Sequence, residues 1–205
     1  MPLAEYMKSE VPKYDANIFF IIENSNNVSS EALNAINHSF EELQKTMSEM
    51  ETTTDMQVKA IILEFDDKCR IITEDGPVHI SEISSIEIRH SDMEPDFEKM
   101  LFTLNGVIKD YCNRNFIKRS FYAPVFIFIT AGPKDTKYVN ALNSLKRSRL
   151  YNLGVRIALQ VDKRNNIERI ADIVGSEEAV LSMSNLDLFT RLFRFQWVEV
   201  EPLLD

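Results

Sequence analysis

Short apolar runs that end abruptly at polar or turn-forming residues constrain the fold of this chain more than any other feature. Residues 17–22 (NIFFII) are followed by the polar stretch ENSNN, and residues 124–130 (PVFIFIT) end at an Ala-Gly-Pro turn. Continuous apolar runs of this length are typical of strands that are buried on both faces of a sheet. Residues 58–65 (VKAIILEF) and 154–161 (GVRIALQV) predict two further strands. We therefore expect four strands.

Amphipathic helices are expected between these strands. Ser29 or Ser30 can cap the first helix, because a hydroxyl there accepts hydrogen bonds from backbone N–H groups of the first turn. The apolar residues that follow recur at spacings of three and four, as on the buried face of a helix. These residues are Leu33, Ile36, Phe40, Leu43, Met47 and Met50.

A second long helix is predicted to begin near Asp92. Ser91 lies three residues before Glu94, which is the spacing of a capping box. A helical apolar face follows, made of Phe97, Met100, Leu101, Leu104, Ile108 and Tyr111.

Three more helices are expected towards the C-terminus. Asp135 is predicted to cap a third helix that carries Val139, Leu142 and Leu145. Residues 167–174 predict a short helix, and residues 186–197 predict a closing helix. The closing helix has large apolar residues on more than one side, so it offers a surface for homo-oligomers.

These elements predict an α/β fold: a doubly wound, mostly parallel central sheet with helices on both faces. One antiparallel edge strand is expected, because Asp66-Asp67 predicts a tight turn from residues 58–65 into residues 69–73. The chain has 205 residues, of which 44% are hydrophobic. We expect a single domain over residues 1–205, with its core at about 15–200.

Charge and hydropathy exclude several classes of protein. The chain has 32 acidic and 23 basic residues, a net charge of −9, which repels phosphate backbones, so nucleic acid is not expected as a partner. No run approaches the roughly 18 apolar residues of a membrane helix, and the first ten residues do not resemble a signal peptide. We expect a cytoplasmic protein with no membrane partner. Its two cysteines, Cys69 and Cys112, are expected to be small buried hydrophobes.

Catalytic motifs are weak in this sequence. The chain lacks a G-x-G-x-x-G motif and a phosphate-binding Gly-Lys-Ser/Thr motif, and no spacing links its three histidines to Ser25 or Cys69 as nucleophiles. We expect no catalytic residues.

A basic cluster is predicted on or beside the third helix, made of Lys146, Arg147 and Arg149, near Lys134 and Lys137. It is interpreted either as a solvated helix face or as a site for an acidic partner.

Ligands of doubly wound sheets bind beyond the carboxyl ends of the strands, so the loops after residues 22 and 130 and around residue 91 are the ones that matter. The loop E-N-S-N-N at residues 23–27 resembles the D-x-S-x-S metal loop of von Willebrand factor A domains. The segment FIFITAGPKD at residues 126–135 resembles the strand and TDG-x-P segment of that family, and the predicted order of elements matches it. The chain resembles the bacterial cytoplasmic members related to the tellurite-resistance group.

The resemblance implies a metal-ion-dependent adhesion site that binds a magnesium-type cation through oxygen ligands. Here, Ser25 matches the motif, but Glu23 replaces an aspartate, Asn27 replaces a serine and Ala131 replaces another aspartate. The threonine of the second loop is also missing, since residues 92–100 contain no Ser or Thr. We therefore expect a degenerate site with no metal and no cofactor; if a metal such as Mg²⁺ binds, Glu23, Ser25 and Asn27 are its ligands.

The function predicted from the resemblance is a non-enzymatic module that binds a protein partner. One alternative is a ligand-binding module that depends on Mg²⁺ or Mn²⁺, and another is a hydrolase or phosphotransfer enzyme on the same sheet. A purely structural role for the first loop is a further interpretation, since its asparagines favour turns. The expected partner-binding residues are Glu23, Asn24, Ser25, Asn26, Asn27, Asp92, Met93, Glu94, Ala131, Gly132 and Asp135.

Overall fold

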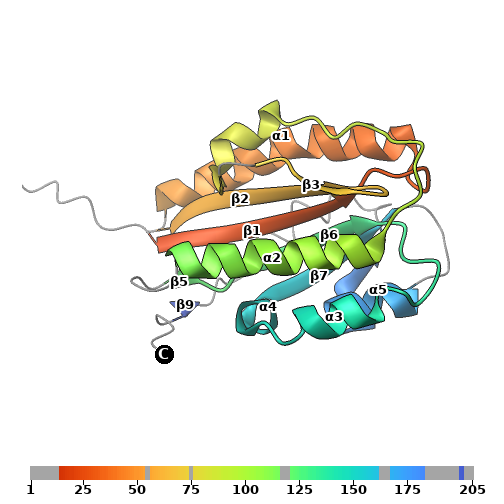
Figure 1. The fold of residues 1–205 in the computed structure, drawn as a ribbon. Helices are drawn as coiled ribbons and strands as arrows, with labels where there is room; N and C mark the ends of the chain where they lie inside the picture. The colour runs from red at the N-terminus through yellow and green to blue at the C-terminus, as the bar shows by residue number, and fades with distance from the viewer. Residues whose placement is uncertain are drawn as a thin grey trace, which may run out of the picture.

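The fold was analysed in a computed structural model that describes residues 14–53, 56–73, 76–115, 121–161, 167–182 and 199–200. Its main sheet has the strand order β3-β2-β1-β6-β7-β8, and β4 also pairs with β2 (Figure 1). The central strands are β1 (Tyr14–Glu23), β2 (Met56–Phe65), β6 (Val125–Thr130) and β7 (Val155–Gln160), and they run parallel to one another. The four predicted strands and the α/β fold class are confirmed.

The middle strand, β1, is buried on both faces. Its side chains alternate between two hydrophobic clusters: Phe20 and Ile22 belong to one, and Phe19 and Ile21 to the other. Alternation of this kind follows from the period of two in a β-strand. Side chains that face both clusters must be apolar, and this explains the continuous apolar run at residues 18–22.

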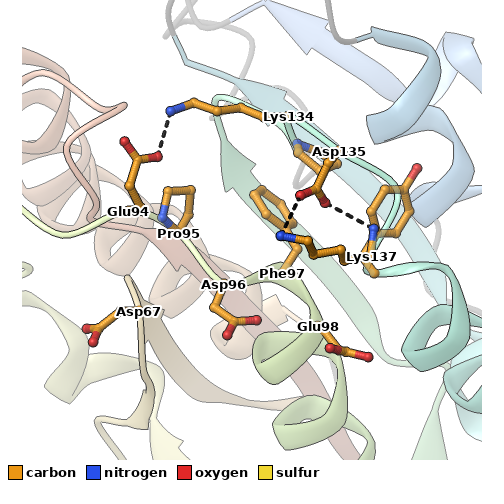
Figure 2. A pocket seen from close by; sticks show the side chains of 11 residues that line it. Asp67, Glu94, Pro95, Asp96, Phe97, Glu98, Lys134, Asp135 and Lys137 are labelled. Atoms are coloured by element: carbon orange, nitrogen blue, oxygen red, sulfur yellow. Dashed lines mark hydrogen bonds and ion pairs between the residues drawn. The ribbon is translucent and has the colours of Figure 1, made fainter.

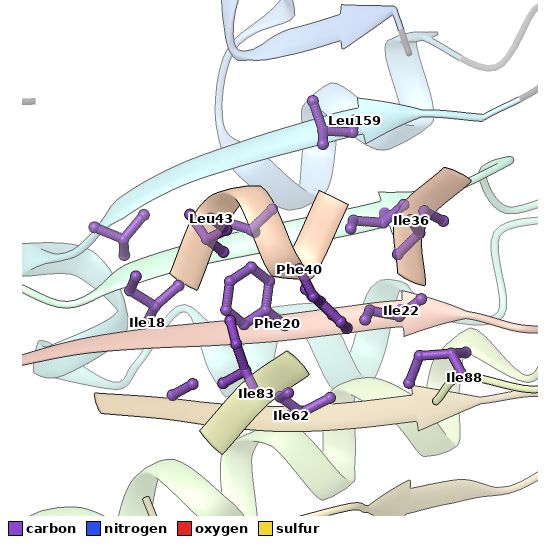
Figure 3. Packing of buried hydrophobic residues seen from close by; sticks show 14 of the residues in the cluster. Ile18, Phe20, Ile22, Ile36, Phe40, Leu43, Ile62, Ile83, Ile88 and Leu159 are labelled. Atoms are coloured by element: carbon purple, nitrogen blue, oxygen red, sulfur yellow. The ribbon is translucent and has the colours of Figure 1, made fainter. Parts of the chain in front are cut away.

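Helices cover both faces of the sheet. The helix α1 (Ser30–Thr53) and the short helix η2 (Ile80–Ser85) pack on one face, where Phe40 lies against Phe20 (Figure 3). The other face is covered by α2 (Phe97–Asn115), α3 (Val139–Leu145), α4 (Arg149–Leu153) and α5 (Ile167–Val174). Among the helices that the structure describes, none combines the length and the apolar character needed to cross a membrane.

The first helix and the hairpin agree with the prediction. Ser29 caps α1, because its Oγ accepts a hydrogen bond from the N–H of Ala32 at 3.2 Å. The strand β3 (Cys69–Ile71) runs antiparallel to β2 at the edge of the sheet. The apolar stripe of α1 is buried at Leu33, Ile36, Phe40, Leu43 and Met47.

The predicted start of the second long helix was wrong. The helix begins at Phe97, and Asp96 caps it, with Oδ1 accepting the N–H of Lys99 at 2.9 Å. Pro95 explains the difference, because a proline disfavours helical geometry at the residue before it. Ser91 forms a local turn instead, in which its Oγ accepts the N–H of Met93 at 3.3 Å.

Asp135 was also wrongly predicted as a helix cap. The helix α3 follows Tyr138, and the Oδ1 of Asp135 accepts the N–H of Lys137 at 3.0 Å in the turn before it. The short helix over residues 167–174 is confirmed as α5. The predicted closing helix over residues 186–197 lies outside the described residues, so an oligomer through it stays a prediction.

Several short elements were not predicted. Three of them are the edge strand β8 (Val180–Ser182), the strand β4 (Val78–His79) and the one-turn helix η3 (Glu177–Ala179). A separate two-stranded sheet pairs β5 (Phe121–Tyr122) with β9 (Glu199–Val200). Strands of two or three residues give too little hydropathy pattern to be found in a sequence.

Candidate functional site

Three loops meet at the carboxyl ends of the central strands: the first loop (residues 23–27), the second loop (residues 89–96) and the third loop (residues 131–137). Asn24 joins the first two loops, because its carbonyl accepts the N–H of Ser91 at 2.7 Å and its side-chain amide donates to the carbonyl of Arg89 at 2.9 Å. The N–H of Asn26 donates to the carbonyl of Met93 at 2.9 Å. The fold thus brings the predicted loop residues together.

The carboxylate of Glu23 joins the first loop to the third. Its side chain is fully buried. Oε1 accepts a hydrogen bond from Ser25 Oγ at 2.6 Å, and Oε2 accepts from Thr130 Oγ1 at 2.5 Å and from the N–H of Ala131 at 2.9 Å. Burial raises the pKa of Glu23 above its ordinary value, and these hydrogen bonds oppose the rise.

Both hydroxyls that donate to Glu23 also accept a backbone hydrogen bond. Ser25 Oγ accepts the N–H of Asn27 at 3.1 Å, and Thr130 Oγ1 accepts the N–H of Gly132 at 2.9 Å. Gly132 has a φ of 92°, a left-handed conformation that favours glycine. With Ala131, these residues form one network of six, in which each oxygen of the Glu23 carboxylate accepts a hydrogen bond from the protein.

This network does not fit a divalent cation. Magnesium requires near-octahedral coordination by oxygen ligands whose lone pairs face the ion. The oxygens of Glu23 and Ser25 that the metal motif would supply are instead held in hydrogen bonds to each other and to backbone N–H groups. Within the described part of the chain, no group of three or more His, Cys, Asp or Glu side chains is placed to hold a metal ion.

The predicted partner-binding residues divide into a buried set and an exposed set. Glu23, Asn24, Ser25, Asn27, Ala131 and Gly132 are buried and hold the loops in place. Asn26, Asp92, Met93, Glu94 and Asp135 are exposed, and the side chain of Met93 is 49% exposed although it is large and apolar. Only the exposed set forms a surface that a partner can touch.

Sequence reasoning missed two residues of this site. Thr130 is the last residue of β6 and matches the threonine of the TDG-x-P segment, but it was not among the expected site residues, although its side chain meets Glu23. Lys134 forms an ion pair with Glu94 at 2.6 Å, and this pair joins the second loop to the third. Neither contact could be inferred from local spacing, because the partners lie 107 and 40 residues apart.

A second polar cluster surrounds His79, away from these loops. Its Nε2 lies 3.1 Å from Glu51 Oε2, and its Nδ1 lies 2.8 Å from Ser81 Oγ, a contact that the spacing argument missed. Nδ1 also accepts the N–H of Ser81, so His79 caps η2. We assign this cluster to capping and to tying the end of α1 to β4. Burial raises the pKa of the Cys69 thiol to about 12, which leaves it a poor nucleophile.

Comparisons with known proteins find similarity in fold but none in sequence. No protein-family model matches the sequence, and no curated protein does. The architecture does match solved structures, including a von Willebrand factor type A protein from Catenulispora acidiphila, with a TM-score of 0.59, 10% identity, and coverage of 88% of this chain and 41% of that one. The chain has a von Willebrand factor A fold.

Two other structures share this von Willebrand factor A fold. Proximal thread matrix protein 1 from the mussel byssus, in a form with a zinc-occupied MIDAS motif, matches with a TM-score of 0.55 and 14% identity over 88% of this chain and 44% of that one. The conserved hypothetical protein BatB from Bacteroides thetaiotaomicron matches with a TM-score of 0.50 and 11% identity, over 87% of this chain and 97% of that one. The chain thus spans less than half the length of the mussel and Catenulispora proteins.

Proposed function

We propose that this chain is a non-enzymatic protein-interaction module whose loop end works without a metal ion. One observation supports the metal-free part: both oxygens of the Glu23 carboxylate accept hydrogen bonds from protein donors, and a cation would have to displace these donors. The von Willebrand factor A fold supports a binding role in general. A cytoplasmic location and a relation to the tellurite-resistance group belong to the same proposal.

The exposed loop residues are the proposed contact surface. Met93 supplies an exposed apolar group, and Asn26, Asp92, Glu94 and Asp135 supply exposed polar groups. Interfaces commonly combine an apolar centre with a polar rim, and Met is enriched in them. The buried network beneath holds the three loops in a fixed arrangement, so a partner would meet a preorganised surface.

A thermal melt tests the metal-free part. The protein is melted with millimolar magnesium, manganese or calcium and with a chelator, because a cation that binds only the folded state must raise stability. We expect the same melting temperature in all conditions. A rise of several degrees that disappears in the Ser25→Ala variant would overturn the proposal and favour the metal-dependent module.

Charge reversal tests the interaction part. Asp92→Lys and Asp135→Lys change exposed side chains, so we expect them to weaken binding of a protein partner and to leave the melting temperature nearly unchanged. Glu42→Lys, at an exposed position of α1, is the matched control and should keep the partner. If the two loop variants unfold the protein, the loops are structural and the interaction function is wrong.

The metal-dependent module is the second candidate, and one observation favours it. Glu23, Ser25 and Thr130 bring a carboxylate and two hydroxyls together, and such oxygens are ligands that magnesium accepts. The ion would have to replace the hydrogen bonds that now join these three side chains. Because metal binding carries this cost, the metal-dependent module is the second candidate.

A further inference from the structure

A pocket of about 430 Å³ lies between the second and third loops, beside the surface that carries the proposed function (Figure 2). Its lining comes from three separate parts of the chain: Asp67 in the β2–β3 turn, residues 94–98 before and at the start of α2, and residues 133–138 before α3. The backbone of two of these parts is joined directly, because the N–H of Asp96 donates to the carbonyl of Asp66 at 2.7 Å. Backbone hydrogen bonding of the fold therefore holds these two parts of the pocket together.

The lining of the pocket has more carboxylates than ammonium groups. It holds five carboxylates against two lysines, an excess of three negative charges. Two cations border the lining: Lys99 pairs with Asp96 at 3.2 Å and donates to the backbone carbonyl of Asp67 at 2.9 Å, and Arg169 donates to the backbone carbonyls of Pro133 and Lys134. Among the described residues, the carboxylates of Asp67 and Glu98 have no hydrogen bond or ion pair, so these two half-buried groups of the lining are free to pair with an incoming cation. An anionic ligand would be repelled, and a cationic one attracted.

The chain already places one of its own ammonium groups at this pocket. Lys134 Nζ lies 2.6 Å from Glu94 Oε2, and Figure 2 shows this pair reaching from one loop to the other. The two side chains are 49% and 63% exposed, and ion pairs as exposed as this contribute little to stability. Lys134 is thus an internal cation that an incoming cation can displace from Glu94.

Apolar residues of the pocket lining can contact the methylene groups of a lysine or arginine side chain. Pro95 and Pro133 line the pocket from the second and third loops, and Phe97 and Tyr138 add aromatic rings to the lining. Lysine and arginine side chains lay their methylene groups along apolar surface while the charged end reaches polar groups. A lysine or arginine can contact these walls and the carboxylates of Asp67 and Glu98.

We propose that this pocket takes a lysine or arginine side chain from a basic segment of a protein partner. The inference rests on the proposed interaction function and names the chemistry of the partner. It also gives Lys134 a role, as a competitor that weakens binding of that side chain.

Binding of short peptides tests the inference. The probes are three fluorescent, end-blocked Gly-Ser hexapeptides that differ only at one central residue, which is arginine, glutamate or serine. We expect only the arginine peptide to bind, and its binding should weaken as salt is added. In the Asp67→Asn/Glu98→Gln double variant, we expect its affinity to fall at least tenfold. In Lys134→Ala, we expect its affinity to rise at least threefold.

The controls separate the pocket from general charge effects. Glu42→Gln removes one carboxylate and Lys45→Ala one ammonium group on the exposed surface of α1, and both should leave peptide affinity unchanged. Equal binding of the glutamate peptide, no loss in the double variant or no gain in Lys134→Ala would overturn the inference. A different result would contradict the proposed function: unfolding of the loop variants Asp92→Lys and Asp135→Lys.

Discussion

Thr130 Oγ1 donates a hydrogen bond to Glu23 Oε2 at 2.5 Å, and so ties the end of β6 to the end of β1 across 107 residues of sequence. Both side chains are buried. The two strands are already paired in the sheet, and this bond fixes how their loops leave it. This contact between a hydroxyl and a carboxylate, together with the N–H of Ala131, joins the first loop to the third.

Thr130→Val should destabilise the protein. The substitution keeps the shape of the side chain but removes one donor to Glu23 and the acceptor for the N–H of Gly132. Leaving buried polar groups unpaired costs about 1–3 kcal/mol. Urea unfolding measures the change, with Thr136→Val at an exposed position as the control. Equal stability of the two variants would contradict the role assigned to Thr130.

The contribution of Glu23 to stability should depend on pH. Burial holds its pKa above the ordinary value of 4.5, so the folded state binds the proton more tightly than the unfolded state does. The contribution is fully present below the unfolded pKa and is lost as the pH rises through the folded pKa. Glu23→Gln removes this titration.

The measurement is the free energy of unfolding of the wild type minus that of Glu23→Gln, by urea at about pH 5, 6 and 7. We expect this difference to become less favourable to the wild type as the pH rises. The subtraction removes the effects of the other carboxylates. A difference that stays constant over this range, or that grows in favour of the wild type, would show that the pKa of Glu23 is not raised.

The sheet could be predicted from the sequence because its central strands carry their signal locally. Phe19 and Phe20 face opposite hydrophobic clusters, so the consecutive apolar residues within 17–22 predict that both faces of the sheet are covered. The prediction of where α2 begins was wrong. The spacing from Ser91 to Glu94 was interpreted as a capping box, and the effect of Pro95 on the residue before it was not considered.

The loop end was only partly predictable. The rule that loops meet at the carboxyl ends of parallel strands placed the first, second and third loops together correctly. The inward direction of Glu23 could not be read from the sequence, because it depends on Thr130 and Ala131 at a distant strand end. For the same reason, the motif gave no indication that Asn26 is exposed while Ser25 and Asn27 are buried.

The length of the Glu23 side chain should decide whether the site accepts a metal. Glu23→Asp shortens the side chain by one methylene, so its carboxylate should withdraw from Thr130 and Ala131 and restore the aspartate of the metal motif. We expect this variant to be less stable than the wild type, and millimolar manganese to raise its melting temperature by a few degrees. The wild type should show no such rise.

A matched variant identifies the ligands in that experiment. Glu23→Asp/Ser25→Ala removes the hydroxyl that the motif shares with von Willebrand factor A domains, so manganese should no longer stabilise it. If manganese stabilises neither variant, the missing threonine and the replacement by Ala131 are enough to abolish the site. If it stabilises the wild type equally, the network around Glu23 does not exclude the ion.

Two glycines should respond to alanine in opposite directions. A Cβ on Gly154 would lie 2.5 Å from the ring of Phe126 and 2.8 Å from the carbonyl oxygen of Pro124, so Gly154→Ala forces the start of β7 away from β6. Overpacking of this kind costs about 1–3 kcal/mol. Gly106 lies exposed in α2 with no atom within 4 Å of an added Cβ. There, alanine should stabilise by roughly 0.5–1 kcal/mol, because glycine is a poor helix former.

Thermal and urea unfolding of the two glycine variants measure this contrast. The same chemical change is made at both positions, so the opposite signs test the packing of β6 against β7 and not the effect of alanine itself. Equal stability of Gly154→Ala and the wild type would mean that Phe126 can move aside, and that the close approach between the two strands is not required by the fold.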